Sequence, residues 1–402
     1  MRQGSIRLGR ILGVPVAMDP GVVLIGGLLS WMLATLILPQ GAPGLVGSVY
    51  WSVGIVGALL FLASLLAHEM AHSIVARRNG VEVEGITLWL FGGFAQFASE
   101  PRDAGAEFRI TAAGPATSLG VAALFLGAAF GLDWLGVPGV YTTMLGWLGV
   151  INAFLGVFNL LPGAPLDGGR ILAAGLWKLR GDRVSGRIGA ARAGKAVGAG
   201  ISGLGVAELL FVGGFGGIWT VFIGWFLFNA ARSEQAYFVG ERALGDLRVG
   251  QAMVTEPPQV RTWTTVAELV DGPLSSTRQT AVAVLDWNGA PAGLVTMAEV
   301  SRVPAEQWGS TEVVRIAKDA ELVPTVDPDD RVVDVMERLT PVSGGYALVV
   351  RDGRTVGMIG PEEIRRAIEV GQLRGGRPAR PTPPPPPVSV PRQRWEPPVP
   401  SQ

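Results

Sequence analysis

The sequence contains no cysteine and only two histidines among its 402 residues. The absence of cysteine excludes disulfides, thiolate metal sites and cysteine nucleophiles, although it assigns no redox compartment. Charged residues make up 16% of the chain, and Lys plus Arg equals Asp plus Glu, so the charge balance predicts no nucleic-acid partner. Metal or nucleophile chemistry must therefore come from two histidines together with carboxylates and hydroxyls.

Positive charge is missing from a long N-terminal stretch. Residues 12–76 contain no Lys or Arg and only two acids, Asp19 and Glu69. Apolar residues form 49% of the chain and glycine is abundant, a composition that is typical of polytopic membrane proteins. Residues 1–19 contain three arginines but no compact apolar core before a small-residue site, so we expect no cleavable signal sequence.

Six segments are apolar over enough residues to predict membrane-spanning helices, which need about 20 residues. The fifth segment contains four glycines, which lower helix propensity but allow close helix packing in a membrane. If all six span, basic residues gather in the loops of one side, whereas loops 39–50, 132–140 and 213–214 contain none. The positive-inside rule then predicts a multi-pass protein of the cell membrane with both termini in the cytoplasm. The segments are 20–38, 52–76, 108–131, 141–162, 196–212 and 215–231.

The loop after the second span carries a different pattern. Apolar residues alternate partly over residues 81–90, which predicts strands rather than a helix. The apolar run 88–97 is too short to cross a membrane. We expect it to enter the membrane as a hairpin or re-entrant piece whose backbone is covered by protein.

After about residue 240 the composition becomes that of a soluble α/β domain. Two similar units follow each other, each with a short strand, a helix, two strands around a turn and a closing helix. The turn signals are Asn288-Gly289 and Asp352-Gly353. The predicted fold is thus a polytopic α-helical membrane domain with a short membrane-associated β segment, followed by a paired soluble α/β module. The predicted domains are 1–235 for the membrane part, 236–306 and 307–371 for the two units, and 372–402 for a Pro-rich tail that we expect to be disordered.

Both histidines lie in one motif, His68-Glu69-Met70-Ala71-His72, which matches H-E-x-x-H. On a helix the two imidazoles lie one turn apart on the same face and can bind one Zn²⁺ ion. Glu69 can then act as general base towards water that the metal activates. Ionisable groups inside a membrane are costly and usually functional. The alternative is a histidine pair hydrogen-bonded inside the helix bundle, with Glu69 as a buried structural acid.

Asp167 is the candidate third ligand, because catalytic zinc usually has three protein ligands and the chain has no third histidine. It lies in the segment 159–169, NLLPGAPLDGG, which ends the fourth span because Pro and Gly break the helix. The second and fourth spans run towards the same membrane face, so His72 and Asp167 are expected to end together. The alternative is that Asp167 caps an Asp-Gly turn.

These motifs resemble those of the site-2 protease family of intramembrane zinc metalloproteases. The matching segments are 68–72, 159–169 and Ala113-Gly114-Pro115, and the resemblance covers most of residues 1–235. It implies that His68, His72 and Asp167 bind zinc and that Glu69 is the catalytic base.

The resemblance also implies roles around the metal. It places Asn159 where the side chain contacts substrate or the developing oxyanion, although a helix-packing hydrogen bond is the alternative for this residue. It places Gly92, Gly93 and Phe94 in a membrane-dipping sheet that pairs with an extended substrate. Their alternative is an ordinary buried turn.

The two C-terminal units look like a pair of cystathionine-β-synthase (CBS) domains, which often bind adenine nucleotides in their cleft. The nucleotide pattern of that family places Ser or Thr three residues before an Asp that holds ribose. Here Thr296 precedes Glu299 in the first unit, and Gly360 precedes Glu363 in the second. Both acids are Glu, and the second unit has Gly360 in place of the hydroxyl residue. A structural or dimerising role is therefore the alternative to nucleotide binding.

The predicted function is hydrolysis of peptide bonds within or near a transmembrane segment of a membrane-protein substrate, in regulated intramembrane proteolysis modulated by the CBS domains. The expected partners are that substrate, the lipid bilayer and a second copy bound through the CBS domains. The rival hypothesis is a CBS-regulated membrane cation transporter or channel, in which the histidines and acids form a cation path. Against it, the other spans carry no matching ladder of ionisable residues.

Overall fold

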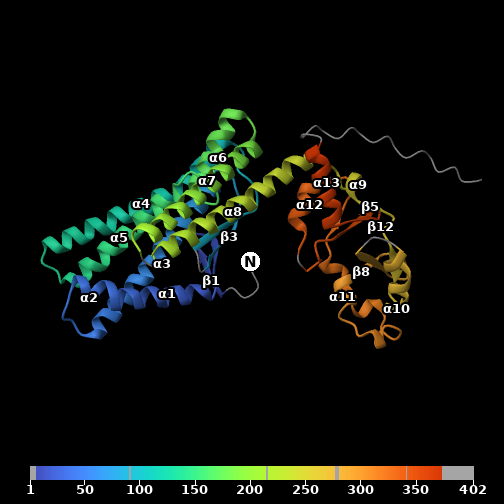
Figure 1. The fold of residues 1–402 in the computed structure, drawn as a ribbon, viewed down its shortest axis with the longest axis horizontal. Coiled ribbons are helices and arrows are strands. Elements are labelled where there is room, and N and C mark those ends of the chain that lie inside the picture. Colours follow the sequence, from blue (N-terminus) through green and yellow to red (C-terminus); the bar gives the residue numbers. More distant parts are fainter. Residues whose placement is uncertain (1–5, 90–91, 214–215, 277–279, 341, 374–402) are drawn as a thin grey trace, which may run out of the picture. The chain divides into compact units, whose positions relative to one another are not determined.

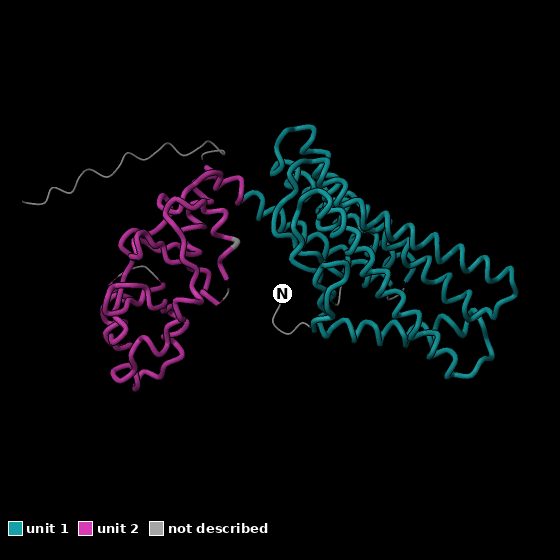
Figure 2. Tube along the Cα trace, turned by 180° about the vertical axis from the view of Figure 1, so that it is seen from behind, with its two compact units in different colours: residues 1–239 teal, residues 240–402 magenta. Residues whose placement is uncertain are grey.

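The computed structural model describes residues 6–89, 92–213, 216–276, 280–340 and 342–373 (Figure 1). The chain forms two compact units, Met1–Val239 and Gly240–Gln402 (Figure 2). The predicted Pro-rich tail lies outside the described residues, except for residues 372 and 373.

Long helices make up most of the first unit (Figure 1). Five stretches are long and apolar enough to cross a membrane, and all five coincide with predicted spans. The first, Gly21–Gly41, joins α1 (Gly21–Met32) and α2 (Leu38–Gly41) through a π-helical turn. The others are α3 (Gly47–Arg78), α4 (Ala104–Trp134), α5 (Gly139–Asn159) and α7 (Arg183–Phe211).

Five of the six predicted spans therefore meet these criteria among the described residues. The sixth segment, 215–231, falls on α8 (Gly216–Leu244) except for residue 215, which lies outside the described residues, and its crossing of the membrane stays a prediction. The region 167–195, expected as a loop, forms α6 (Asp167–Arg180) and the start of α7. Asp182 caps α7 by accepting from the backbone N–H groups of Val184 and Ser185, both at 3.1 Å.

A four-stranded sheet lies beside the helices, in the order β1-β2-β3-β4. The strands predicted after the second span are confirmed as the antiparallel hairpin β3 (Val83–Trp89) and β4 (Gly92–Phe97). The hairpin of β1 (Ile6–Ile11) and β2 (Val14–Met18) was not expected, and β2 joins β3 in parallel. One face of the sheet packs on α3, where Met70 shares a core with residues of β2 and β3. The strand β4 forms one edge of the sheet.

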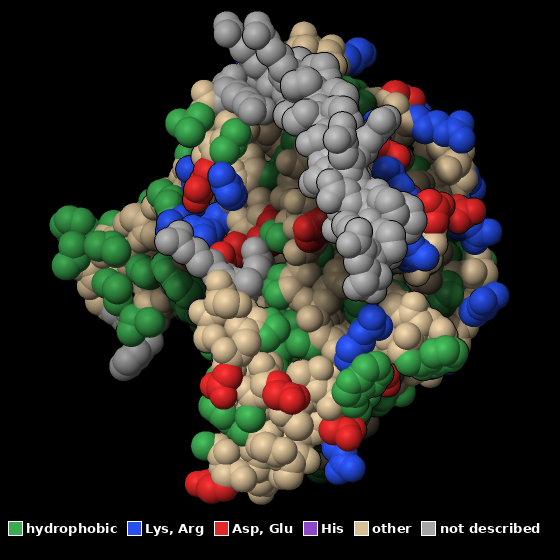
Figure 3. All heavy atoms as spheres, turned by 90° about the vertical axis from the view of Figure 1, so that its right-hand side faces the viewer, with side chains coloured by type: hydrophobic (Ala, Val, Ile, Leu, Met, Phe, Trp, Pro, Cys, Tyr) green, Lys and Arg blue, Asp and Glu red, His purple; other side chains and the backbone are tan. Residues whose placement is uncertain are grey.

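The second unit contains two further four-stranded sheets. The predicted hairpins are confirmed, with Gly289 (φ 86°) in the turn between β7 (Ala281–Leu285) and β8 (Pro291–Thr296) and Gly353 (φ 75°) in the turn between β11 (Ala347–Arg351) and β12 (Arg354–Ile359). Basic and acidic side chains are interspersed on the face of the molecule drawn in Figure 3. The remaining strands are β5 (Val254–Thr255), β6 (Gln259–Arg261), β9 (Lys318–Asp319) and β10 (Thr325–Val326), and the helices are α9 (Val249–Ala252), α10 (Val266–Leu269), α11 (Met297–Val300), α12 (Val332–Arg338) and α13 (Pro361–Leu373).

Candidate active site

The H-E-x-x-H residues lie in the C-terminal third of α3. Helical spacing puts His68 and His72 one above the other, with ring centroids 4.9 Å apart. Both rings are buried, and Glu69 between them in sequence is also buried. Because α3 crosses the membrane region, three polar side chains are held in a segment that is otherwise strongly apolar. Such burial needs partners for each polar group.

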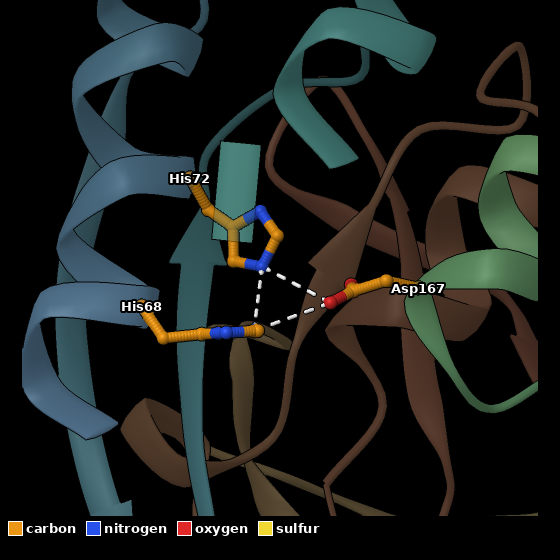
Figure 4. Close-up of side chains that lie close together, drawn as sticks. All are labelled: His68, His72 and Asp167. Atoms are coloured by element: carbon orange, nitrogen blue, oxygen red, sulfur yellow. Dashed lines mark hydrogen bonds and ion pairs between the residues drawn. The ribbon is translucent and has the colours of Figure 1, made fainter. Parts of the chain in front are cut away.

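Asp167 meets the two histidines from α6 (Figure 4). Its Oδ2 atom lies 3.2 Å from His68 Nε2 and 3.3 Å from His72 Nε2. The two Nε2 atoms are 3.2 Å apart. The three ligand atoms therefore form a nearly equilateral triangle, and among the described residues this is a group suited to hold a metal ion.

The triangle has the size that zinc needs. Tetrahedral zinc binds nitrogen and oxygen at about 2.0–2.1 Å, which places neighbouring ligand atoms about 3.3 Å apart. The other ring nitrogens are already engaged: His68 Nδ1 lies 2.8 Å from Ser118 Oγ, and His72 Nδ1 lies 2.8 Å from the carbonyl oxygen of Ile110. This leaves both Nε2 atoms for a metal, and the carboxylate supplies an anionic oxygen. The donor set therefore fits zinc.

The backbone around Asp167 is packed without spare room. A Cβ on Gly168 would lie 2.3 Å from the carbonyl oxygen of Leu160, and one on Gly169 would lie 2.3 Å from the backbone nitrogen of Ala164. Real Cβ atoms do not approach backbone so closely, so these two positions require glycine. The Gly-Gly pair after Asp167 thus lets the start of α6 lie against the turn 160–166, which fixes where the carboxylate points.

A cavity of about 260 Å³ opens beside the triangle. Glu69 lines it, and a Cβ on Gly93 of β4 would lie only 2.5 Å from Glu69 Cγ, so the edge strand contacts the candidate base directly. The cavity brings α3, α4, α5, α6 and β4 together around one space. Its lining includes His68, Glu69, His72, Gly92, Gly93, Phe94, Ile110, Thr111, Leu155, Asn159, Asp167 and Arg170.

All the predicted residues of the membrane part reach this cavity. Asn159 ends α5, and its side-chain N–H donates to the carbonyl oxygen of Leu155 at 3.0 Å, so one of its two N–H groups is used within the helix. Sequence reasoning missed Ile110, Ser118 and Arg170. Only the Arg170 position, one turn after Asp167, carried a signal that could have been found.

Thr296 and Glu299, which were predicted to bind nucleotide, form hydrogen bonds with each other. Thr296 ends β8, and both its backbone N–H, at 3.1 Å, and its hydroxyl donate to the carboxylate of Glu299 in α11. Lys318 Nζ lies 3.4 Å from the same carboxylate. Burial raises the pKa of Glu299, but these hydrogen bonds and the ammonium outweigh burial, so the pKa lies below its usual range. The two side chains form a capping box.

Comparisons with known proteins identify the families to which the two parts of the chain are similar. Residues 56–137 and 135–199 match Peptidase family M50, and residues 320–370 match the CBS domain. The "Putative zinc metalloprotease Rip3" of Mycobacterium tuberculosis is 41% identical over 92% of this chain and 94% of its own length. The "Putative zinc metalloprotease sll0528" of Synechocystis is 31% identical over 91% of this chain and 96% of its own length.

A solved structure is also similar. The "Site-2 Protease from Methanocaldococcus jannaschii" is 30% identical, covers 57% of this chain and 95% of its own, and superposes with a TM-score of 0.38. The H-E-x-x-H helix, the carboxylate opposite it and a relative that matches 92% of the chain all point to the same family. The chain belongs to peptidase family M50, as a membrane-embedded zinc metalloprotease of the site-2 protease type that carries a CBS-domain region.

Proposed function

We propose that His68, His72 and Asp167 hold the catalytic zinc ion and that Glu69 is the general base. The convergence of the three ligand atoms, each within 3.3 Å of the others, carries this assignment. When bound, zinc supplies a Lewis acid and makes water a competent nucleophile near neutral pH. The cavity beside the triangle gives that reaction a place inside the membrane domain.

In the proposed reaction, side chains of the protein transfer the proton and bind the substrate. Glu69 accepts a proton from the attacking water and delivers it to the nitrogen of the leaving peptide. Asn159 keeps one side-chain N–H outside its helical hydrogen bond, and this N–H donates to the developing oxyanion. Leu155 of α5 and Phe94 of β4 contribute apolar side chains to the cavity wall, and a low local dielectric there strengthens both interactions.

The substrate is a transmembrane segment that unwinds before cleavage. The carbonyl groups of an intact helix are hydrogen-bonded and lie inside the helix backbone, which keeps them from the base. We infer that the unwound stretch lies along β4 as an added strand, because β4 is a sheet edge and Gly92, Gly93 and Phe94 line the cavity. Because Gly93 has no Cβ, the edge strand lies directly against Glu69, so a peptide paired with β4 would lie close to the base.

The test is the Glu69→Gln variant, reconstituted in lipid with a single-span membrane-protein substrate. The amide keeps the size of the side chain but cannot accept the proton, so we expect cleavage to fall by about 10³-fold or more. Zinc content should stay at the wild-type level, because Glu69 is not one of the three ligands. Wild-type turnover in this variant would refute the assignment of the base. His68→Ala is the matched control that should lose zinc and activity together.

The CBS region is proposed to regulate cleavage, as part of regulated intramembrane proteolysis. Adenine nucleotide binding through Thr296 and Glu299 requires the capping box between them to open, or the ligand to contact its outer side. A second copy of the chain is the proposed partner of this region. We further propose that both termini face the cytoplasm, an orientation that requires α8 to cross the membrane although it is less apolar than the five spans.

The cation-transporter hypothesis is not favoured. The relatives that match nearly the whole chain carry names of zinc metalloproteases. The ionisable residues of the metal centre converge on one point beside a cavity instead of forming a series across the membrane. Metal flux in liposomes in the absence of cleavage would favour the transporter instead.

A further inference from the structure

One face of α4 contacts both histidine rings through three positions spaced by four residues. Ile110 and Ser118 contact the two Nδ1 atoms, each at 2.8 Å, and Gly114 lies between them. A spacing of four residues places all three on one stripe of a helix. Because α3 and α4 run in opposite directions, the later histidine meets the earlier α4 position. We call Ile110, Gly114 and Ser118 the α4 stripe.

Ile110 determines the tautomer of His72. A carbonyl oxygen can only accept a hydrogen bond, so His72 Nδ1 must carry the proton that it donates at 2.8 Å. In the neutral ring Nε2 then has a free lone pair, the form that binds metal. The main chain supplies this contact, so no substitution of the Ile110 side chain removes it.

Gly114 sets the distance between α4 and the metal centre. A Cβ at this position would lie 2.2 Å from His72 Nε2 and 2.6 Å from His68 Nε2. These are the two proposed ligand atoms, so the helix backbone itself closes the centre on this side. The rings are thus held between α3, which carries them, and the α4 stripe.

Ser118 contributes a side-chain hydrogen bond from the stripe to a ring. Its hydroxyl is completely buried and lies 2.8 Å from His68 Nδ1. A hydroxyl can accept from Nδ1–H, and this tautomer leaves His68 Nε2 free beside Asp167. In the opposite tautomer Nε2–H would point towards Asp167 and His72, and the metal would have to displace that proton. By accepting from Nδ1–H, Ser118 can hold His68 in the tautomer that is ready to bind metal.

We propose that Ser118 is a positioning residue that holds His68 in the metal-binding tautomer. This rests on the proposed function only in taking His68 as a zinc ligand. Groups that accept the second ring N–H of a histidine ligand orient the ring and raise its basicity, and their loss typically weakens metal binding about 10–100-fold. The contribution is independent of substrate, so it can be measured by zinc binding alone.

The experiment measures zinc affinity of the purified full-length chain by competition with a chromophoric chelator. Ser118→Ala should weaken zinc binding by about 10–100-fold. Ser118→Thr keeps the hydroxyl on the same Cβ and should retain most of the affinity. The matched control is Thr117→Ala, one position earlier on α4, where the hydroxyl donates to the carbonyl oxygen of Ala113 at 2.8 Å and contacts no histidine.

The outcomes separate this proposal from the proposed function. Wild-type affinity in Ser118→Ala, combined with lost affinity in His68→Ala, overturns the role of Ser118 and leaves the zinc ligands intact. Unchanged affinity in His68→Ala overturns the ligand assignment itself. Equal losses in Ser118→Ala and Thr117→Ala would mean that α4 merely loosens, which also overturns the proposal. Thermal unfolding of the metal-free variants checks that Ser118→Ala and Ser118→Thr fold as the wild type does.

Discussion

At the scale of single residues, the site depends on glycines as much as on the residues with chemistry. Gly93 lets β4 approach Glu69, and Gly114 lets α4 approach both histidines. Neither position needs the unusual backbone angles that glycine permits, since neither has a positive φ. What each supplies is the absence of a Cβ, which brings an edge strand and a helix backbone into direct contact with polar side chains.

The Gly93→Ala substitution should separate catalysis from metal binding. The added Cβ would lie 2.5 Å from Glu69 Cγ and 3.0 Å from Cδ, so the carboxylate must move. A displacement of about 1 Å at a reacting group can cost about 100-fold in turnover. We therefore expect cleavage to fall by about that factor while zinc content is unchanged, as measured by substrate cleavage and metal analysis of one preparation.

The control is Gly120→Ala on α4, where an added Cβ meets no atom within 4 Å. It should leave both quantities at the wild-type level. If Gly93→Ala cleaves substrate at the wild-type rate, Glu69 is not held by β4 in the way that the geometry indicates.

The histidine pair of the proposed metal centre could be predicted from the sequence because its signal is local. The spacing of His68 and His72 on a helix requires no knowledge of the rest of the fold. To predict Asp167 one had to see in addition that the second and fourth spans end at the same membrane face. The structure places Asp167 against both histidines. Ser118 could not be found this way, since one serine in an apolar helix has many equivalents and its contact depends on how α3 and α4 pack.

At the scale of secondary-structure elements, small residues let neighbouring helices touch backbone to backbone. A Cβ on Gly198 of α7 would lie 2.6 Å from the backbone nitrogen of Phe228 in α8, and one on Gly194 would lie 2.2 Å from the carbonyl oxygen of Ala164. The same helix therefore packs on α8 and on the turn that precedes Asp167. Close approach of this kind is how helices associate in membranes.

Gly198→Ala should destabilise the membrane part. Backbone atoms 2.6 Å and 2.8 Å away cannot rotate out of the path of the new methyl group, so α7 and α8 must separate. Such overpacking typically costs about 1–3 kcal/mol. The free energy of unfolding, measured in detergent with increasing denaturant, should fall by that amount.

Gly200→Ala is the matched control on the same helix. No atom lies within 4 Å of its added Cβ, and alanine favours helix over glycine, so stability should stay equal or rise. Equal stability of the two variants would contradict the backbone contact between α7 and α8.

Helices could be predicted from the sequence where the apolar runs are long. Five of the six predicted spans coincide with helices that are long and apolar enough to cross a membrane, because a stretch of about 20 apolar residues has few alternatives. The region 167–195 was read as a loop because its charges resemble those of cytoplasmic loops, yet Gly181 (φ 71°) and Asp182 only separate two helices there. The β1–β2 hairpin escaped notice because short strands carry little signal without their sheet partners.

At the scale of the whole molecule, the two halves of the α/β unit exchange strands. The sheet order β10-β11-β12-β5 includes β5 from the first half, and the order β6-β7-β8-β9 includes β9 from the second. Gly293 of β8 lies so close to β9 that a Cβ would be 2.4 Å from the carbonyl oxygen of Lys318. Strand exchange of this kind depends on residues distant in sequence, so repeat boundaries alone could not predict it. The boundary at residues 306 and 307 remains a prediction about sequence repeats.

We therefore expect a shorter truncated chain to resist proteolysis better than a longer one. A chain that ends at Val239 keeps the first compact unit with every residue of the metal centre, so we expect it to bind one zinc ion. A chain that ends at residue 306 keeps β5 without its partner β12 and β8 without β9, which leaves unpaired edges and exposed core residues.

We expect limited proteolysis to degrade this longer chain back to about residue 240 and leave the shorter chain intact, with zinc measured in both. A protease-resistant 236–306 segment in the longer chain would mean that the first half folds without its exchanged strand.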